Sequence, residues 1–294
     1  MNEKTKEHRS GRIRERVMQI VFLIAACISI LAVALICIYL FANGLPAIFE
    51  IGPLNFLLGT DWRPNADHYG IFPMILGSIY VTAGAIIVGV PLGLLAAIFM
   101  AKFCPTALYQ SLNPAVDLLA GIPSIVYGFF GLMVVVPLMQ QLFSNTSGKS
   151  ILTASVLLGI MILPTIIGVS ESAIRAVPDS YYDGALALGA SHERSVFFVT
   201  VPAAKSGIMA GIILGVGRAI GETMAVIMIA GNQPQIPDSL LDGVRTLTGN
   251  IVMEMGYSTG LHREALIATG VVLFVFILII NLLFSIIKRK ERKA

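Results

Sequence analysis

Two charged residues lie inside a long apolar segment, and their chemistry is that of anion contact or ion pairing within a membrane. The segment covers residues 206–232 and reads SGIMAGIILGVGRAIGETMAVIMIAGN, with Arg218 and Glu222 near its middle. It is long enough to cross a bilayer as a helix, and a charge at bilayer depth costs roughly 2.5–3.5 kcal/mol on insertion scales. At positions i and i+4 the two side chains share one helix face. We therefore expect this face to look into protein or water.

Three glycines fall on the same predicted face as the two charges. Gly207, Gly211 and Gly215 are spaced by four residues, and small residues at this spacing let a second helix approach closely. An ionisable residue within a membrane is a functional hypothesis by default. Two roles stay open for the charges: a substrate pathway or gate, and a structural ion pair that joins two helices.

The composition is that of a polytopic membrane protein. The 294 residues are 56% hydrophobic and 13% charged, with a mean hydropathy of +0.84, whereas soluble domains carry roughly 25% charged residues. The predicted fold class is all-α, with about six transmembrane helices and no large soluble domain. The apolar segments expected to span the membrane cover residues 17–41, 73–101, 115–140, 151–171, 203–231 and 265–287.

Basic residues gather in the two tails, residues 1–16 and 288–294. Six spans place both tails on one side, and fifteen of the twenty Lys and Arg residues then lie there: six in the first tail, five in the second and four in loops. This excess of basic residues on one side predicts cytoplasmic termini. As a topology signal it also explains the basic tails, so nucleic-acid binding is not needed to explain them. Between the tails we expect a first transmembrane helix with a periplasmic loop (17–72) and a transporter domain (73–287).

No group of residues indicates covalent chemistry or a metal site. Cys27, Cys37 and Cys104 lack metal or redox spacing, and the four histidines are scattered. The sequence GVGRAIG does not follow a strand and lacks the context of a nucleotide fingerprint. We therefore expect no catalytic residues, no metal and no cofactor bound by this chain.

A polar but patterned segment separates the fourth and fifth predicted spans. Residues 178–202 read PDSYYDGALALGASHERSVFFVTVP. Ser180 followed by Asp183 resembles a capping box, Gly189 is suited to end the helix, and Ser191 is suited to cap a second short helix. The pattern predicts a small helix–turn–helix at the cytoplasmic surface.

The first of these two helices carries apolar side chains at helical spacing. Tyr181, Ala185 and Leu188 share one face, and Tyr182 and Leu186 share another. An apolar face of this kind suits docking into a groove of a partner protein. It also suits a helix that lies on the lipid headgroups, and the residues alone leave both interpretations open.

The same segment resembles the permeases of ABC importers. Their motif is Glu-Ala-Ala, three residues, Gly, nine residues and Ile-x-Leu-Pro, and this chain has DGA at 183–185, Gly189 and VTVP at 199–202 with the same spacing. The departures are Asp for Glu, Gly for the first Ala and Val for the two aliphatic residues. In the family this segment is the coupling helix, which fits a cleft on an ATPase subunit. The resemblance implies that the residues in contact with the ATPase are Tyr181, Tyr182, Asp183, Ala185, Leu186, Leu188 and Gly189.

A narrower resemblance points to the phosphate-importing members of these permeases. Residues 217–223, GRAIGET, resemble their Gly-Arg-Ala-x-Gly-Glu-Thr stretch, and residues 121–128, GIPSIVYG, are similar to their third-helix motif. The stretch 62–78 resembles their outer loop, with Ser78 where threonine is expected. The continuation 224–232 is closer to one pore-forming subunit than to its partner, the PstA type. The resemblance covers most of the chain from Trp62 onward.

The resemblance implies a permease subunit of a type I importer in a bacterial or archaeal cytoplasmic membrane. Its implied partners are a PstA-type permease subunit, two ATPase subunits that use ATP, and a periplasmic phosphate-binding protein, which the outer loop 233–264 either touches or leaves to solvent.

Because guanidinium matches phosphate oxygens with a forked set of donors, we expect Arg218 to contact or screen the anion. Glu222 would then position Arg218 or close a gate.

Two alternatives to phosphate import stay open. The first is import of another oxyanion, such as molybdate or sulfate. The second is an ion-coupled secondary carrier, since carriers also use broken helices and central charges. The six-span length and the coupling motif argue against a carrier.

Overall fold

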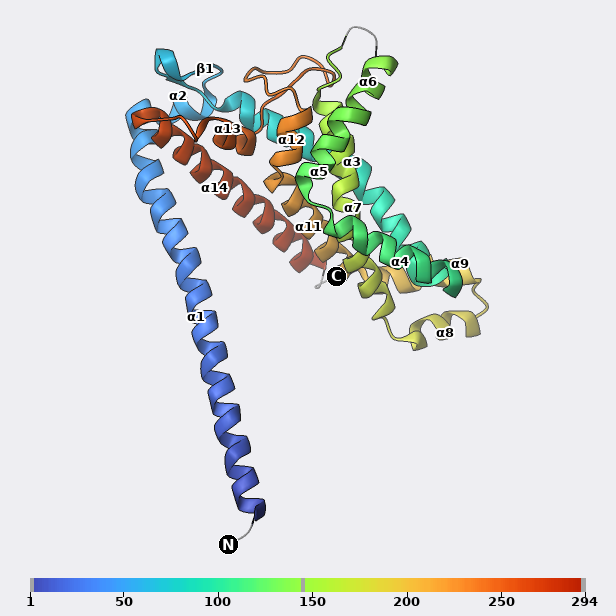
Figure 1. Cartoon of the computed structure of the whole chain (residues 1–294). Helices are drawn as coiled ribbons and strands as arrows, with labels where there is room; N and C mark the ends of the chain where they lie inside the picture. The colour runs from blue at the N-terminus through green and yellow to red at the C-terminus, as the bar shows by residue number, and fades with distance from the viewer. Residues whose placement is uncertain (1–2, 144–145, 292–294) are drawn as a thin grey trace.

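The chain folds as a bundle of helices with a small hairpin at one end (Figure 1). The computed structural model describes residues 3–143 and 146–291, without the side chains of residues 3–14, 284–285 and 287–291. Both predicted basic tails, 1–16 and 288–294, therefore lie almost entirely outside the described side chains.

The helices are α1 (Glu3–Ile51), α2 (Pro53–Leu58), α3 (Phe72–Ile98), α4 (Thr106–Gly121), α5 (Ser124–Phe130), α6 (Val136–Leu142), α7 (Ile151–Arg175), α8 (Asp179–Ala187), α9 (His192–Ser195), α10 (Val201–Ala203), α11 (Lys205–Gly221), α12 (Met224–Ile229), α13 (Leu247–Glu254) and α14 (Gly260–Glu291). Shorter elements are the 3-10 helix η1 (Pro64–Ala66) and the π-helical turns η2 (Phe99–Phe103), η3 (Gly131–Val135) and η4 (Val196–Thr200). Strands β1 (Trp62–Arg63) and β2 (His68–Tyr69) pair antiparallel, with Trp62 opposite Tyr69.

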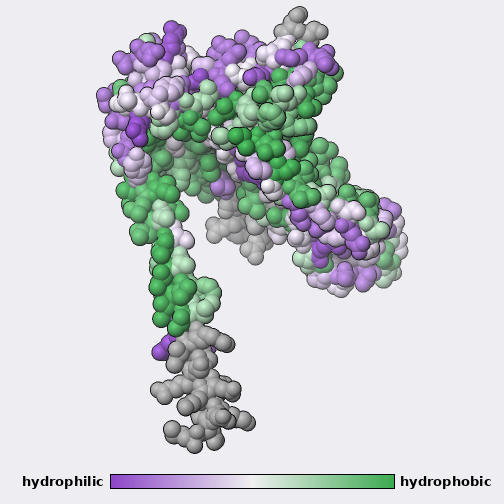
Figure 2. All heavy atoms as spheres, in the orientation of Figure 1, coloured by the Kyte–Doolittle hydropathy of each residue, from purple (hydrophilic) through white to green (hydrophobic). Residues whose placement is uncertain are grey.

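Among the described residues, five helical stretches are long and apolar enough to cross a membrane, and a bent pair makes a sixth span. In Figure 2 the apolar surface lies between hydrophilic surfaces at the two ends of the molecule. The predicted all-α, six-span class is therefore confirmed. The stretches are Glu15–Ile51, Phe72–Phe103, Ser124–Leu142, Ile151–Arg175 and Gly260–Leu283, and the pair is His192–Ala203 with Lys205–Gly221, bent by 70°.

Three of the predicted spans have wrong limits. The first helix continues past residue 41 to Ile51. The third span begins at Ser124 instead of 115, because α4 ends at Gly121 and the backbone is extended at Ile122 and Pro123. A residue that precedes proline is disfavoured in the helical conformation. The fifth span is broken both at its start and near its middle.

The centre of the bundle is the packing of α3 and α11 against α7. Glycines on α11 permit the close approach: a Cβ atom on Gly211 would lie 3.0 Å from the Ser170 hydroxyl, and one on Gly215 would lie 2.8 Å from Ile166 Cγ1. A Cβ atom on Gly207 would overlap that of Ala173. The glycine face therefore packs within this chain, against α7.

Valine at Gly207 is expected to destabilise the bundle, whereas valine at Gly217 is the matched control. Both glycines lie in α11, but a Cβ atom built on Gly217 would meet no atom within 4 Å apart from its chain neighbours and the nearby backbone of its own helix. Overpacking typically costs about 1–3 kcal/mol, which corresponds to a melting temperature lower by roughly 2–10 °C. Thermal unfolding of the purified chain in detergent measures both variants. Equal melting temperatures would contradict this packing.

Helix α1 lies apart from the bundle over most of its length (Figure 1). Its C-terminal part packs on α14, where the Phe41 and Phe274 rings meet edge to face at 5.9 Å. In the most apolar window of α1 no residue is buried. This surface is therefore left for lipid or for another protein.

Candidate functional site

Helix α11 ends in the middle of the segment that was predicted to be one continuous helix. The backbone at Glu222 is extended, and α12 starts two residues later. The Glu222 carboxylate accepts the backbone N–H groups of Thr223 (2.9 Å) and Ala225 (3.3 Å), and so caps α12. The Glu222 carbonyl accepts the hydroxyl of Thr248 at 3.1 Å. The break is stable because these bonds satisfy polar backbone groups that a continuous helix would have paired.

Arg218 lies one turn before the break and is half-buried. Its guanidinium donates to the Thr165 hydroxyl on α7 at 3.3 Å. None of the ion pairs among the described residues includes Arg218 or Glu222. The prediction that the two residues share a helix face was wrong, because α11 ends at Gly221 and the backbone at Glu222 is extended.

A second helix break lies beside the first. Helix α5 starts after the extended residues Ile122 and Pro123, and it packs on α12. Gly128 permits the contact, because a Cβ atom there would lie 2.8 Å from Ala225 Cα. The Tyr127 hydroxyl donates to the Leu119 carbonyl at 2.9 Å, which connects α5 to the last turn of α4. Two short helices thus start side by side next to Arg218, an arrangement that suits a polar route within a membrane.

The segment between α7 and α11 folds as two short helices, as predicted. Gly189 has a φ of +84°, its N–H donates to the Leu186 carbonyl, and the N–H of Ala190 donates to the Ala185 carbonyl. These bonds form a Schellman C-cap, so the predicted cap is confirmed. Ser191 caps α9 through the backbone N–H of Arg194, also as predicted.

Two details of this segment differ from the prediction. Helix α8 starts after Pro178 without a side-chain cap, so the expected capping box of Ser180 and Asp183 is absent. The second helix continues through η4 and α10 to Ala203 before the chain bends into α11.

The apolar side chains of α8 divide into outward and inward groups. Leu188 is 91% exposed and Tyr181 55%, and Leu186 is also exposed. Tyr182 and Ala185 are half-buried, whereas Asp183 and Gly189 are exposed. The segment lies at the opposite end of the bundle from the β hairpin (Figure 1). Its free apolar surface is therefore smaller than the predicted set of seven residues.

A buried cluster at the hairpin end was missed at the sequence level. The Glu254 carboxylate, 7% exposed as a residue, accepts from Trp62 Nε1 at 2.9 Å and from Arg245 at 2.6 Å, and it bonds His262 Nε2 at 2.8 Å. Arg245 also donates to the Asn250 side chain at 3.0 Å.

Residues 233–264 are thus not a simple solvated loop, because they contain helix α13, whose residues 247–250 and Glu254 are buried. The opposite charges of Arg245 and Glu254 were visible in the sequence, but nothing there linked them to Trp62.

Alanine at Glu254 is expected to destabilise the hairpin end strongly. The substitution leaves the Arg245 guanidinium and the Trp62 indole N–H without their acceptor, and breaking one side of a buried ion pair typically costs about 3–5 kcal/mol. Thermal unfolding should show a large drop for Glu254→Ala and a smaller one for Glu254→Gln, which keeps an acceptor. Asp238→Ala, at an exposed position, is the control. An unchanged melting temperature for Glu254→Ala would refute this role.

One carboxyl group at the hairpin end, outside the spans, has a pKa below its ordinary range. The hydrogen bond from His68, together with Arg63, lowers the pKa of Asp61. This acid is therefore charged at neutral pH and keeps the hairpin end polar.

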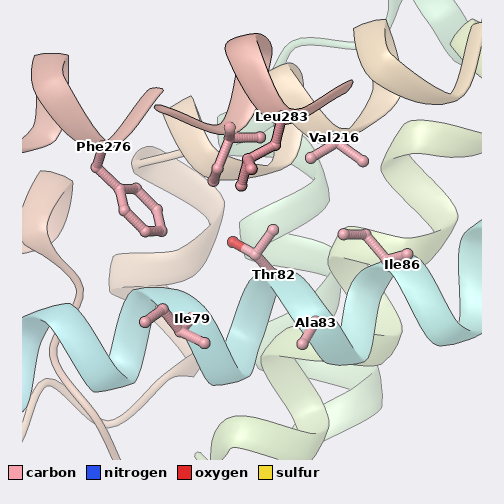
Figure 3. A pocket seen from close by; sticks show the side chains of 8 residues that line it. Ile79, Thr82, Ala83, Ile86, Val216, Phe276 and Leu283 are labelled. Atoms are coloured by element: carbon pink, nitrogen blue, oxygen red, sulfur yellow. The ribbon is translucent and has the colours of Figure 1, made fainter. Parts of the chain in front are cut away.

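An apolar groove of about 360 Å³ lies between α3, α11 and α14 (Figure 3). Its lining includes Ile79, Val216, Phe276 and Leu283, and Thr82 supplies the one polar side chain. A cavity of this chemistry offers no partner for an anion, so it is not part of the site at Arg218. Across the described residues, no group of three or more His, Cys, Asp or Glu side chains is placed to hold a metal ion.

A six-span bundle with two helices broken beside a half-buried arginine defines a membrane permease. Residues 89–293 match the family described as binding-protein-dependent transport system inner membrane component, and the chain belongs to this family. It is therefore a multi-pass protein of the inner membrane and a component of an ABC importer, as the sequence resemblance implied.

Named relatives cover most of the chain. It is 39% identical to the "Probable ABC transporter permease protein YqgH" of Bacillus subtilis, over 90% of this chain and 89% of that protein. It is 34% identical to the "Phosphate transport system permease protein PstC" of Mesorhizobium japonicum, over 87% and 84% of the two chains. The corresponding PstC of Pasteurella multocida is 33% identical, over 83% of each chain.

Solved structures share the fold at low sequence identity. A chain of a bacterial alginate ABC transporter, crystallised with a pentasaccharide-bound periplasmic protein, matches with a TM-score of 0.66 and 14% identity, over 95% of this chain and 98% of that one. A chain of the inward-facing MetNI methionine ABC transporter matches with a TM-score of 0.56 and 20% identity, over 76% and 94%. These matches support the fold alone.

Proposed function

We propose that this chain forms half of the transmembrane pathway of an ATP-driven importer of inorganic phosphate. The observation that carries the proposal is the half-buried guanidinium of Arg218 beside two broken helices, with no carboxylate of the described chain paired to it. Relatives at 33–34% identity are named as phosphate permeases, which favours phosphate over molybdate or sulfate.

In this proposal Arg218 offsets part of the cost of moving an anion away from water. A guanidinium is always charged and presents a fork of donors that fits the oxygens of phosphate. A single donor group held by one long hydrogen bond to Thr165 binds the anion weakly enough for release, as conduction requires. Glu222 acts on the shape of the pathway, because its carboxylate holds the start of α12.

The proposed assembly has three kinds of partner. A PstA-type permease supplies the other half of the pathway, two ATPase subunits supply the energy by hydrolysing ATP, and a periplasmic phosphate-binding protein delivers the substrate. The exposed side chains of α8 are the proposed contact with an ATPase subunit. The hairpin end then faces the periplasm, which places the two termini in the cytoplasm.

Cytoplasmic termini are expected to be protected from labelling in intact cells. In a variant without Cys27, Cys37 and Cys104, a single cysteine at Ser10 should react with a membrane-impermeant maleimide only after lysis. A cysteine at Asp238, in the outer loop, should react in intact cells and serves as the positive control. Labelling at Ser10 before lysis would reverse the proposed topology.

Reconstitution of the complex tests the proposed function directly. Proteoliposomes with both permease subunits, the ATPase and the binding protein should accumulate phosphate only when ATP is present on the ATPase side. An excess of molybdate or sulfate should leave the rate unchanged. Competition by either anion at equal concentration would indicate that the substrate is another oxyanion. Uptake driven by an ion gradient without ATP would show that the chain is not part of an ATP-driven importer.

A further inference from the structure

We infer that Tyr182, His192 and Phe103 form an internal joint that positions α8 and carries its displacement to α3 and α11. The inference rests on the proposed docking of α8 to an ATPase subunit. It assigns Tyr182 a positioning role inside this chain in place of the docking role that the sequence resemblance implied for it.

The first contact of the joint is the pairing of Tyr182 with His192. The Tyr182 hydroxyl lies 2.7 Å from His192 Nδ1, and the two rings meet edge to face at 5.7 Å. Tyr182 also packs on a buried cluster that includes Ile174 and Val196. The neighbouring Tyr181 is exposed. Of two adjacent tyrosines, one therefore fastens α8 to the bundle and the other leaves its surface free.

The second contact runs from His192 to the end of α3. The His192 ring lies 4.7 Å from the ring of Phe103 at an interplanar angle of 69°. Phe103 is the last residue of η2, the π-helical turn that closes α3, and its ring lies 6.1 Å from Phe197 in η4. The His192 ring thus lies between Tyr182 of α8 and Phe103 of η2.

Lys102 ties the start of α8 to the same place. Its ammonium group lies 5.8 Å from the centre of the Tyr182 ring and 3.8 Å from the Asp179 carboxylate. The Lys102 side chain is only 17% exposed, which favours a fixed position over a freely moving one. Both the first turn of α8 and its inward tyrosine are therefore connected to η2.

The two π-helical turns lead from the joint to the proposed pathway. η2 continues into α3, which packs along α7, and η4 continues through α10 and a 70° bend into α11, which carries Arg218. π-Helical turns occur frequently at functional sites because they interrupt the regular helix ladder. A displacement of α8 would therefore be transmitted to α3 and α11 through Phe103 and His192.

Tyr182→Phe tests the joint in the complete reconstituted importer, because it keeps the ring and removes only the hydroxyl. The expected result is normal co-purification of the ATPase, with the ATP hydrolysed per phosphate transported raised about fivefold, the factor that corresponds to one net hydrogen bond. Tyr181→Phe makes the same chemical change on the exposed neighbour and should leave the ratio unchanged.

A second variant asks whether the Tyr182–His192 bond carries the effect. His192→Phe keeps a ring against Phe103 and removes Nδ1, so it should raise the ratio as Tyr182→Phe does. The double variant should be no worse than the more affected single one, because both remove the same bond.

An unchanged ratio in both single variants, or effects that multiply in the double variant, would overturn the joint. Loss of the ATPase from Tyr182→Phe would also overturn it, since Tyr182 would then be a docking residue. Failure of the proposed function itself is distinct: the unmodified complex would lack ATP-dependent phosphate uptake.

Discussion

Replacement of Arg218 by glutamine is expected to lower phosphate uptake by the reconstituted importer by about 10- to 150-fold. The substitution keeps a donor of similar length but removes the fixed positive charge from the proposed pathway. A hydrogen bond to a charged group is worth about 1.5–3 kcal/mol, which sets this range. The complex should still assemble, because Arg218 holds the bundle through one long bond to Thr165 and takes part in no described ion pair.

The matched control is Arg263→Gln, which removes a charge from an exposed position near the hairpin end. Uptake by this variant should equal that of the unmodified complex. Full uptake by Arg218→Gln would reject the anion pathway at this residue, and poor recovery of the complex would show that Arg218 is structural.

A double variant combines Arg218→Gln with Glu222→Gln. Its phosphate uptake can be predicted from the two single variants, because the two side chains are not paired with each other. Glu222 caps α12, whereas Arg218 reaches α7. Independent effects should therefore multiply in the double variant. Recovery of uptake in the double variant would mean that the two charges pair in another state of the transporter.

Aspartate at Leu188 is expected to weaken ATPase binding by about a hundredfold, a loss in the range typical of an interface hot spot. The side chain is 91% exposed, so the substitution should leave the fold of the chain intact. In the proposed interface the new carboxylate would be buried without a partner, which is strongly unfavourable. Co-purification of the ATPase with the tagged permease measures the loss.

Two further variants separate docking from other roles of α8. Leu188→Met keeps an apolar side chain and should retain the ATPase. Ser180→Asp adds the same charge at an exposed position in the first turn of α8 and should have a small effect. If Leu188→Asp retains the ATPase in full, docking through Leu188 is wrong, and α8 is then an interfacial helix on lipid headgroups.

Much of the fold followed from local patterns. Hydropathy and length indicated the class and six spans, and the spacing of Gly207, Gly211 and Gly215 marked the face that packs on α7. The cap at Gly189 was visible because only glycine adopts a positive φ without strain after an exposed helix. The break before α5 could have been placed from Pro123, since the preceding residue is disfavoured in a helix.

The break at Glu222 could not be read from the sequence. Apolar residues continue on both sides of it, so the hydrophobic pattern of a membrane helix is uninterrupted. The bond that supports it comes from Thr248, 26 residues further along the chain. Arg218 was singled out as a charge inside an apolar segment, and it is half-buried, but its partner Thr165 is 53 residues away on another helix. Tertiary bonds of this kind decide which charges meet, and single-sequence periodicity contains no information on them.

The cluster around Glu254 also bears on how the chain is made. The acceptor of the Trp62 indole N–H, Glu254, is synthesised 192 residues after Trp62. His262, which also bonds Glu254, is synthesised later still. At about 5–20 residues per second of synthesis, this delay is about 10–40 s. During that time the Trp62 indole lacks the carboxylate that it bonds in the folded chain. The hairpin end can therefore close only after nearly the whole chain has left the ribosome, and a chain that stops before Glu254 lacks this acceptor.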